Sequence, residues 1–159
     1  MRPLLAAGEL SNLSFKKFLR QKSITEVQDL ANEVSMEVEK QVDCTLCGNC
    51  CRKLQPGLHH QEAERLASLS QIDEELFKQE HVLFEGEHCY LKAKPCYFLQ
   101  CNLCKIYDQR PESCRDFPHL RSGHFKYKRS IWINYSLCPI VFNTIERMKE
   151  RLGFNQHSG

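Results

Sequence analysis

At residues 44 to 52 the sequence reads Cys44-Thr45-Leu46-Cys47-Gly48-Asn49-Cys50-Cys51-Arg52. Two residues between cysteines allow a tight turn to aim both sulfurs at one metal ion, and the stretch repeats this spacing. The glycine after Cys47 frees backbone N–H groups to hydrogen-bond thiolates. The C-x2-C-x2-C-C motif therefore predicts a metal site with cysteine ligands. Adjacent cysteines in an extended chain point to opposite sides, so we expect Cys51 to face a second metal or to bridge two.

Six more cysteines follow at longer spacings: Cys89, Cys96, Cys101, Cys104, Cys114 and Cys138. Two ligand partitions fit. In one, the bacterial ferredoxin spacing is copied by Cys44, Cys47, Cys50 and the remote Cys138-Pro139, which leaves Cys51, Cys96, Cys104 and Cys114 for another centre. In the other, the plant-type C-x4-C-x2-C spacing is copied by Cys96, Cys101 and Cys104, and the first four cysteines form their own site. The spacing indicates zinc or an iron–sulfur cluster and does not choose between them.

Composition indicates one small domain in a reducing compartment. The chain has 159 residues, 42% of them hydrophobic, and its apolar runs are too short for a secretory or membrane-spanning segment. We therefore expect a cytoplasmic protein, in which clustered cysteines bind metal before they form disulfides. The net charge of +2 does not predict a nucleic-acid or membrane partner. The expected partners are metal ions and an unidentified protein.

Apolar periodicity predicts helices at residues 23–42, 60–69, 72–80 and 139–152, with Ser23 and Glu26 as a capping box. A short helix beginning at Pro111 would carry Cys114. Residues 44–58 and those from about 85 onward are expected to be mostly irregular, and alternation at 124–134 predicts a strand or hairpin arm. The predicted fold is mainly α, with irregular metal-stapled loops and one short β-hairpin. Its parts are an N-terminal extension (1–22), a cysteine-cluster metal-binding domain (23–153) and a frayed tail (154–159).

Several stretches together resemble the YkgJ-like cysteine cluster family, also described as zinc- or iron-chelating CxxCxxCC domains. The matching stretches are the motif from Cys44 to Arg52, Glu62–Ala67, Pro95–Leu99, Cys104–His119 and Cys138-Pro139. The resemblance implies eight metal ligands: Cys44, Cys47, Cys50, Cys51, Cys96, Cys104, Cys114 and Cys138. Cys89 and Cys101 do not match the family pattern and are expected to be free thiols. The same cluster occurs in flagellin lysine methylase, so the module can be part of an enzyme.

Three functions fit these observations. The first is a metal-stabilised structural or interaction module, the second an iron–sulfur redox or protein-modifying enzyme component, and the third metal storage or delivery. The sequence contains no nucleophile–base pair, phosphate loop or paired carboxylates, so no catalytic residue is predicted and any catalysis would depend on the metal. We expect Arg110, Arg115 and Asp116 to balance the charge of the cluster or to pair with each other. His119 is expected to be a packing or surface residue.

Overall fold

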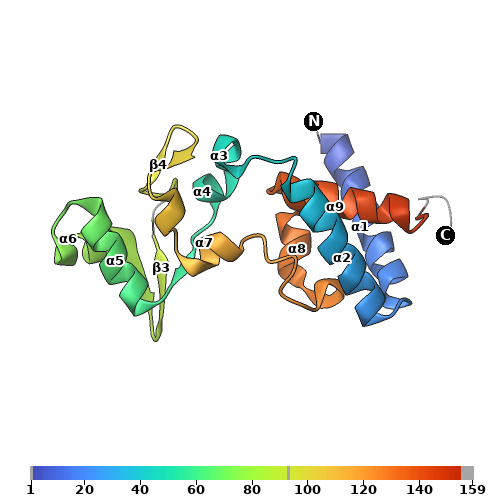
Figure 1. Ribbon diagram of the computed structural model, residues 1–159, viewed down its shortest axis with the longest axis horizontal. Helices are drawn as coiled ribbons and strands as arrows, with labels where there is room; N and C mark the ends of the chain where they lie inside the picture. Colours follow the sequence, from blue (N-terminus) through green and yellow to red (C-terminus); the bar gives the residue numbers. More distant parts are fainter. Residues whose placement is uncertain (1, 93, 155–159) are drawn as a thin grey trace. The chain divides into compact units, whose positions relative to one another are not determined.

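The computed structural model of the chain describes residues 2–92 and 94–154, and describes side chains from residue 11 onward. The chain divides into two compact units, which are coloured by sequence in Figure 1. A helical unit combines the residues up to Val42 with those from Pro118, and a cysteine unit contains Asp43–Phe117. The helical unit is thus built from two chain segments, which are joined beside the interruption by an ion pair between Arg121 and Glu39. The predicted mainly α fold is confirmed.

Two long helices of the helical unit were predicted correctly. α2 spans Ile24–Glu39, and the Ser23 hydroxyl caps it by accepting a hydrogen bond from the Glu26 amide at 2.9 Å. α9 spans Pro139–Arg151, and Gly153 follows it with the positive φ of 61° that ends many helices. The two helices pack together. Their buried apolar faces consist of Val27, Ala31, Val34 and Val38 on α2 and Ile140, Val141, Ile145 and Met148 on α9.

The N-terminal extension contains a helix that the sequence analysis did not predict. α1 spans Arg2–Arg20, and its Phe15 and Leu19 side chains are fully buried. Phe154, which was assigned to the frayed tail, places its ring 5.0 Å from the Phe15 ring, and residues 155–159 lie outside the described part of the chain. The Lys126 amine donates hydrogen bonds to the carbonyls of Arg20 and Lys22 at 2.8 and 2.6 Å. It thereby supplies a donor to backbone carbonyls that lack a partner within the helix at the C-terminal end of α1.

The strand predicted at 124–134 is wrong. This stretch forms a 3₁₀ turn at Phe125–Tyr127 and the helix α8 at Arg129–Ile133, followed by a 3₁₀ turn at Asn134–Ser136. The alternating pattern fails because Tyr127 and Ile133 are exposed while Lys126 is buried. The Phe125 amide donates to the Gln28 side chain on α2 at 2.9 Å, so tertiary contacts rather than strand pairing satisfy this backbone.

The cysteine unit contains short helices and two small antiparallel sheets. Its helices are α3 (Cys44–Cys47), α4 (Asn49–Lys53), α5 (His60–Ser70), α6 (Glu74–His81) and α7 (Glu112–Asp116), with a 3₁₀ turn at Tyr107–Gln109. One sheet has the order β1 (Gly57–Leu58), β3 (His88–Leu91), β2 (Val82–Glu85), and the other pairs β4 (Leu99–Gln100) with β5 (Leu103–Cys104). Helices α5, α6 and α7 confirm three predicted helices. The β2–β3 hairpin replaces part of the loop expected after residue 85, and Gly86 supplies the positive φ of its turn.

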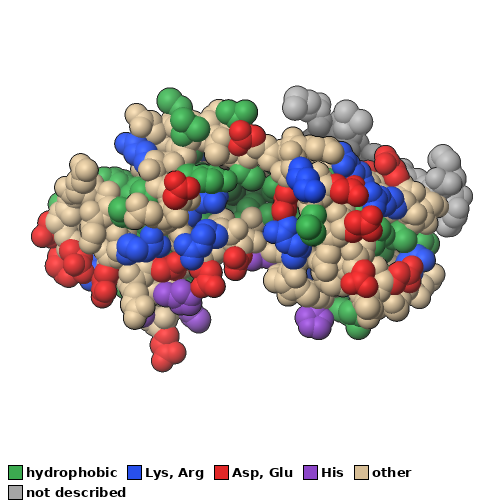
Figure 2. Space-filling view, in the orientation of Figure 1, with side chains coloured by type: hydrophobic (Ala, Val, Ile, Leu, Met, Phe, Trp, Pro, Cys, Tyr) green, Lys and Arg blue, Asp and Glu red, His purple; other side chains and the backbone are tan. Residues whose placement is uncertain are grey.

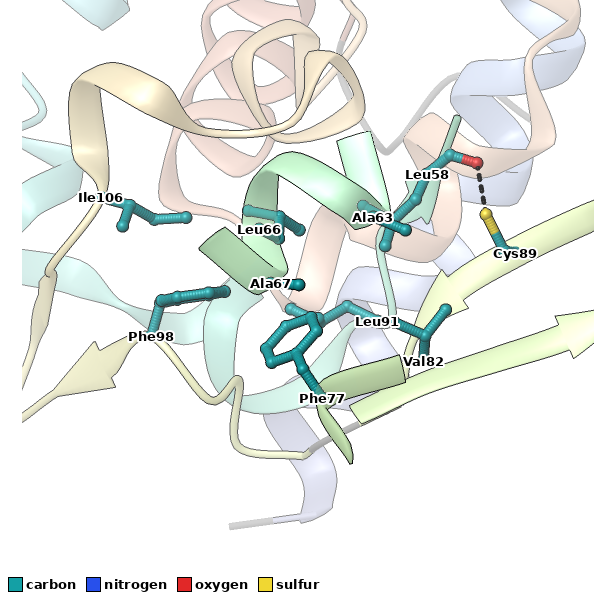
Figure 3. Packing of buried hydrophobic residues seen from close by; sticks show 10 residues of the cluster. All are labelled: Leu58, Ala63, Leu66, Ala67, Phe77, Val82, Cys89, Leu91, Phe98 and Ile106. Carbon is teal, nitrogen blue, oxygen red and sulfur yellow. Dashed lines mark hydrogen bonds between the residues drawn. The ribbon is translucent and has the colours of Figure 1, made fainter. Parts of the chain in front are cut away.

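The core of the cysteine unit lies between α5, α6 and the larger sheet (Figure 3). Phe77 of α6 is fully buried, and its ring packs against those of Tyr97 and Phe98 at 5.8 and 6.0 Å. Cys96 and Cys104 pack against this core while remaining partly exposed. The core thus fixes the positions of two predicted ligands at its edge.

Candidate metal centre

The four cysteines of the C-x2-C-x2-C-C motif lie on the short helices α3 and α4 rather than on the irregular loop that the sequence predicted. The Asp43 carboxylate caps α3 by accepting hydrogen bonds from the amide and hydroxyl of Thr45 at 2.8 and 2.6 Å. Gly48 then adopts a φ of +62° and separates α3 from α4. A Cβ at Gly48 would lie 3.0 Å from Arg52 Nη1 and 3.3 Å from the carbonyl of Asn102. Glycine is therefore required here both by the backbone conformation and by the close approach of these groups.

Cys50 and Cys51 do not lie on the extended chain that was assumed when Cys51 was expected to face a second metal or to bridge two. Both residues lie on α4, and their sulfurs are 3.9 Å apart. Two thiolates bound to one tetrahedral zinc ion, with Zn–S bonds of about 2.3 Å, have sulfurs separated by about 3.8 Å. The observed separation is therefore compatible with both sulfurs binding one ion.

The two thiols of this pair differ in acidity. A hydrogen bond from the Cys50 thiol lowers the pKa of Cys51, although burial and the charges of neighbouring thiolates act in the opposite direction. The same hydrogen bond raises the pKa of Cys50, and burial adds to the effect. When a metal binds, it replaces the proton on each thiol that becomes a ligand.

Three cysteines from distant parts of the sequence join this pair. Charges on Cys96, Cys104 and Cys114 act on Cys51 directly. Burial, followed by the charges of Cys96, Cys50 and Cys104, raises the pKa of Cys114 to about 12. Burial is also the main cause of the raised pKa of Cys96. We call these five residues the thiol cluster: Cys50, Cys51, Cys96, Cys104 and Cys114.

Backbone contacts hold the thiol cluster together. The Cys96 amide donates to the Cys51 carbonyl at 2.7 Å, and this bond joins the segment around Cys96 to helix α4. Cys104 is held by the β4–β5 hairpin, where it pairs with Leu99. Helix α7 carries Cys114, and its Ser113 hydroxyl donates to the Gly57 carbonyl of β1 at 2.7 Å. Tertiary structure therefore brings together thiols that are far apart in the sequence.

The other cysteines lie outside the thiol cluster. Cys44 is exposed and Cys47 partly exposed on α3, which packs beside β5. Cys138 belongs to the helical unit, where it is buried at the N-cap of α9. Cys89 is buried and donates to the Leu58 carbonyl at 3.0 Å, whereas Cys101 is exposed with a φ of +56°. The eight-ligand set remains a prediction.

Comparison with known protein families assigns this cysteine arrangement. The chain matches the CxxCxxCC family over residues 43–138, which is more than half of its length. The chain belongs to the CxxCxxCC family. That family is described as a "putative zinc- or iron-chelating domain". No protein of curated function and no solved structure matches the chain.

The family match begins at Asp43, where the cysteine unit also begins. Zinc or iron chelation by this CxxCxxCC domain agrees with the chemistry of the thiol cluster, because thiolates bind both zinc and iron–sulfur centres. In the described ranges, no three His, Cys, Asp or Glu side chains already surround one point as metal ligands.

Arg52 has a role that the sequence analysis did not identify. Its guanidinium donates to the carbonyls of Cys47 and Cys101 at 2.9 and 3.2 Å, and also to the Asn102 side chain. These bonds tie α3 to the turn between β4 and β5. The sequence indicated only a cation near the cysteines, because neither Asn102 nor the carbonyl partners belong to a recognisable motif.

The other cations near the cysteines have separate roles. Arg110 lies over the Tyr107 ring at 3.5 Å from its centroid and donates to the Tyr107 carbonyl at 2.6 Å, and its charge offsets a small part of the rise in the pKa of Cys114 that burial and neighbouring thiolates cause. This contact supports the expected charge-balancing role. Arg115 donates to the Arg110 carbonyl at 2.7 Å. His119 lies in the helical unit.

We predict that Arg52→Lys lowers the metal affinity of the domain about tenfold, the usual scale for losing a group that orients metal ligands. Lysine retains the charge but cannot donate to three acceptors with a planar guanidinium. Competition with a chromophoric chelator measures the change. Lys53→Arg is the matched control, since Lys53 is the exposed neighbour on α4. Equal affinities of both variants and the original protein would contradict this role.

Proposed function

We propose that this CxxCxxCC domain is a zinc-binding structural module, in which zinc orders the cysteine unit so that its surface can bind a protein partner. The observation that carries this proposal is the 3.9 Å separation of the Cys50 and Cys51 sulfurs, which suits two thiolates on one tetrahedral ion. Cys96, Cys104 and Cys114 supply further thiolates beside this pair. A site closed by cysteine ligands leaves no position for a substrate, as in structural zinc sites.

The elements around the thiol cluster support a structural role for the metal. Helices α3, α4 and α7 have four or five residues each, and strands β4 and β5 have two each. Elements this short gain little stability from their own hydrogen bonds. Metal–thiolate bonds that join them would contribute directly to folding.

The remaining family positions are included in the proposal. Cys44 and Cys47 lie on α3 beside β5. We assign them to a second zinc site, because the five thiols of the thiol cluster already exceed the four ligands that one zinc ion binds. Cys138 is proposed as a ligand on the strength of the family pattern. The five cysteines of the thiol cluster form no disulfide with each other. Zinc–thiolate binding requires reduced cysteines, which supports a cytoplasmic location. None of the described helices has the length and apolar character needed to cross a membrane.

Elemental analysis of protein purified without oxygen tests the metal. We expect two zinc ions per chain, no acid-labile sulfide and no visible absorption. Brown protein with iron and sulfide in equal amounts would contradict the zinc proposal and would indicate an iron–sulfur protein. Expression in medium supplied with both metals ensures that availability does not decide the result.

A further inference from the structure

Cys101 is a thiol that neither the thiol cluster nor the family pattern uses. It lies on the turn between β4 and β5, its side chain is exposed, and its φ is +56°. Glycine and asparagine adopt this backbone conformation most easily. Neither the turn nor the core therefore requires a cysteine at this position, and the thiol is accessible to reagents in the solvent.

The turn that carries Cys101 is bound to the segment that carries Cys47. The Arg52 guanidinium donates to the Cys47 carbonyl at 2.9 Å and to the Cys101 carbonyl at 3.2 Å. The residues that follow them also meet, because a Cβ at Gly48 would lie 3.3 Å from the carbonyl oxygen of Asn102. Helix α3 packs beside β5 in addition. The backbones at Cys47 and Cys101 therefore lie close together, although the two residues are far apart in the sequence.

Both thiols lie where an oxidant can reach them. Cys101 is exposed and Cys47 is partly exposed. Figure 2 shows side chains of the hydrophobic class (green), which includes cysteine, at the surface over α3 and the β4–β5 hairpin. Cys89, the other cysteine outside the family pattern, is only 2% exposed and donates to the Leu58 carbonyl. Because oxidation of a thiol depends on its exposure, Cys101 is the more reactive of these two cysteines.

We propose that Cys47 and Cys101 form a reversible disulfide that withdraws Cys47 from the metal. This inference rests on the proposed function, in which Cys44 and Cys47 bind a second zinc ion. A disulfide requires the two Cα atoms to lie within about 7 Å of each other. The contacts made by Arg52 and Gly48 hold the two backbones at close range, so that rotation of the side chains can bring the sulfurs together.

The reaction consumes one molecule of a two-electron oxidant, such as hydrogen peroxide. Peroxide converts the Cys101 thiol to a sulfenic acid and releases one water molecule as its O–O bond breaks. The Cys47 thiolate then attacks the Cys101 sulfur, the S–S bond forms, and the sulfenic hydroxyl leaves as a second water molecule with one proton from solvent. The two sulfurs together lose two electrons, and Cys47 no longer carries the thiolate that zinc requires.

The test is oxidation of the zinc-loaded chain with hydrogen peroxide. Remaining thiols are then blocked, and disulfides are mapped by peptide mass spectrometry. We expect the Cys47–Cys101 disulfide to form first, with release of about half of the bound zinc to a chromophoric chelator. Dithiothreitol should reverse the disulfide and restore zinc binding. A first disulfide within the thiol cluster, or release of zinc without a Cys47–Cys101 disulfide, would overturn the proposal.

The variant Cys101→Ser should lack this disulfide and release zinc at least about tenfold more slowly in peroxide, because its sulfenic acid cannot form. Cys89→Ser is the matched control: it removes the other cysteine outside the family pattern and should release zinc like the original chain. Equal release rates from Cys101→Ser and the original chain would contradict the proposal. Disulfide mapping does not depend on the identity of the metal, so a chain that holds iron would contradict the zinc module and not the pairing of these thiols.

Discussion

Replacing Cys51 by serine is expected to lower the zinc affinity of the chain by at least about 100-fold. Structural zinc sites bind with apparent free energies of about 10–16 kcal/mol, so the loss of one ligand in four removes about 3 kcal/mol or more. Serine has nearly the shape of cysteine, but its hydroxyl does not ionise near neutral pH and binds zinc poorly. Cys51 is the most informative position, because its thiol interacts with all four other members of the thiol cluster. Chelator competition at fixed pH measures the affinity.

Cys101→Ser is the matched control for this substitution. Cys101 is exposed on the neighbouring turn and lies outside the thiol cluster, so its replacement should change zinc affinity by less than about twofold. If Cys101→Ser weakens binding as strongly as Cys51→Ser, the ligand assignment is wrong and the plant-type spacing of Cys96, Cys101 and Cys104 regains support. If neither substitution weakens binding, the thiol cluster does not hold the metal.

Removal of the metal by a chelator should increase amide hydrogen exchange in residues 44–57 and 95–117 by at least about tenfold, while helix α9 changes little. The first two stretches consist of very short helices and strands that share few buried apolar side chains. Helix α9, in contrast, is held by its apolar face against α2. Local opening follows this difference in packing. Hydrogen exchange with peptide-level mass spectrometry, before and after chelation, resolves these regions.

Helices α5 and α6 provide an internal reference in the same unit. Their packing rests on the core around Phe77 and not on the thiols, so they should lose less protection than residues 44–57. Readdition of zinc should restore the original exchange pattern. A uniform loss of protection throughout the chain would show instead that the metal stabilises both units together.

The long helices could be predicted because their signals are local. Ser23 caps α2, apolar residues recur along α5, and Gly153 ends α9, so sequence and structure agree at these positions. The prediction at 124–134 failed because a few alternating residues also fit a 3₁₀ turn followed by a short helix. A tertiary contact decides the structure of this stretch, because the Phe125 amide donates a hydrogen bond to the side chain of Gln28, which lies almost a hundred residues earlier in the chain.

The site shows the same division between local and tertiary information. The spacing of the motif correctly indicated cysteine-based metal binding, which the family match supports. It could not show that α4 brings the sulfurs of Cys50 and Cys51 together, since that depends on helical geometry in a stretch without helical periodicity. The contribution of Arg52 depends on Asn102 and on backbone carbonyls, which have no sequence signature.

The helical unit is interrupted by the cysteine unit, and the ion pair between Glu39 and Arg121 joins the two flanking segments. When the inserted residues are disordered, folding of the helical unit must close them into a flexible ring, at an entropic cost that grows by about 0.6 kcal/mol for each doubling of ring length. Once ordered, the insertion is a short rigid link with fixed ends. If zinc halves the flexible part of this ring, it stabilises α2 and α9 through chain connectivity alone by about 0.6 kcal/mol, which is a small effect beside that on residues 44–57. Helices α2 and α9, which lie outside the residues that match the CxxCxxCC family, thus need no direct contact with the metal to respond to it.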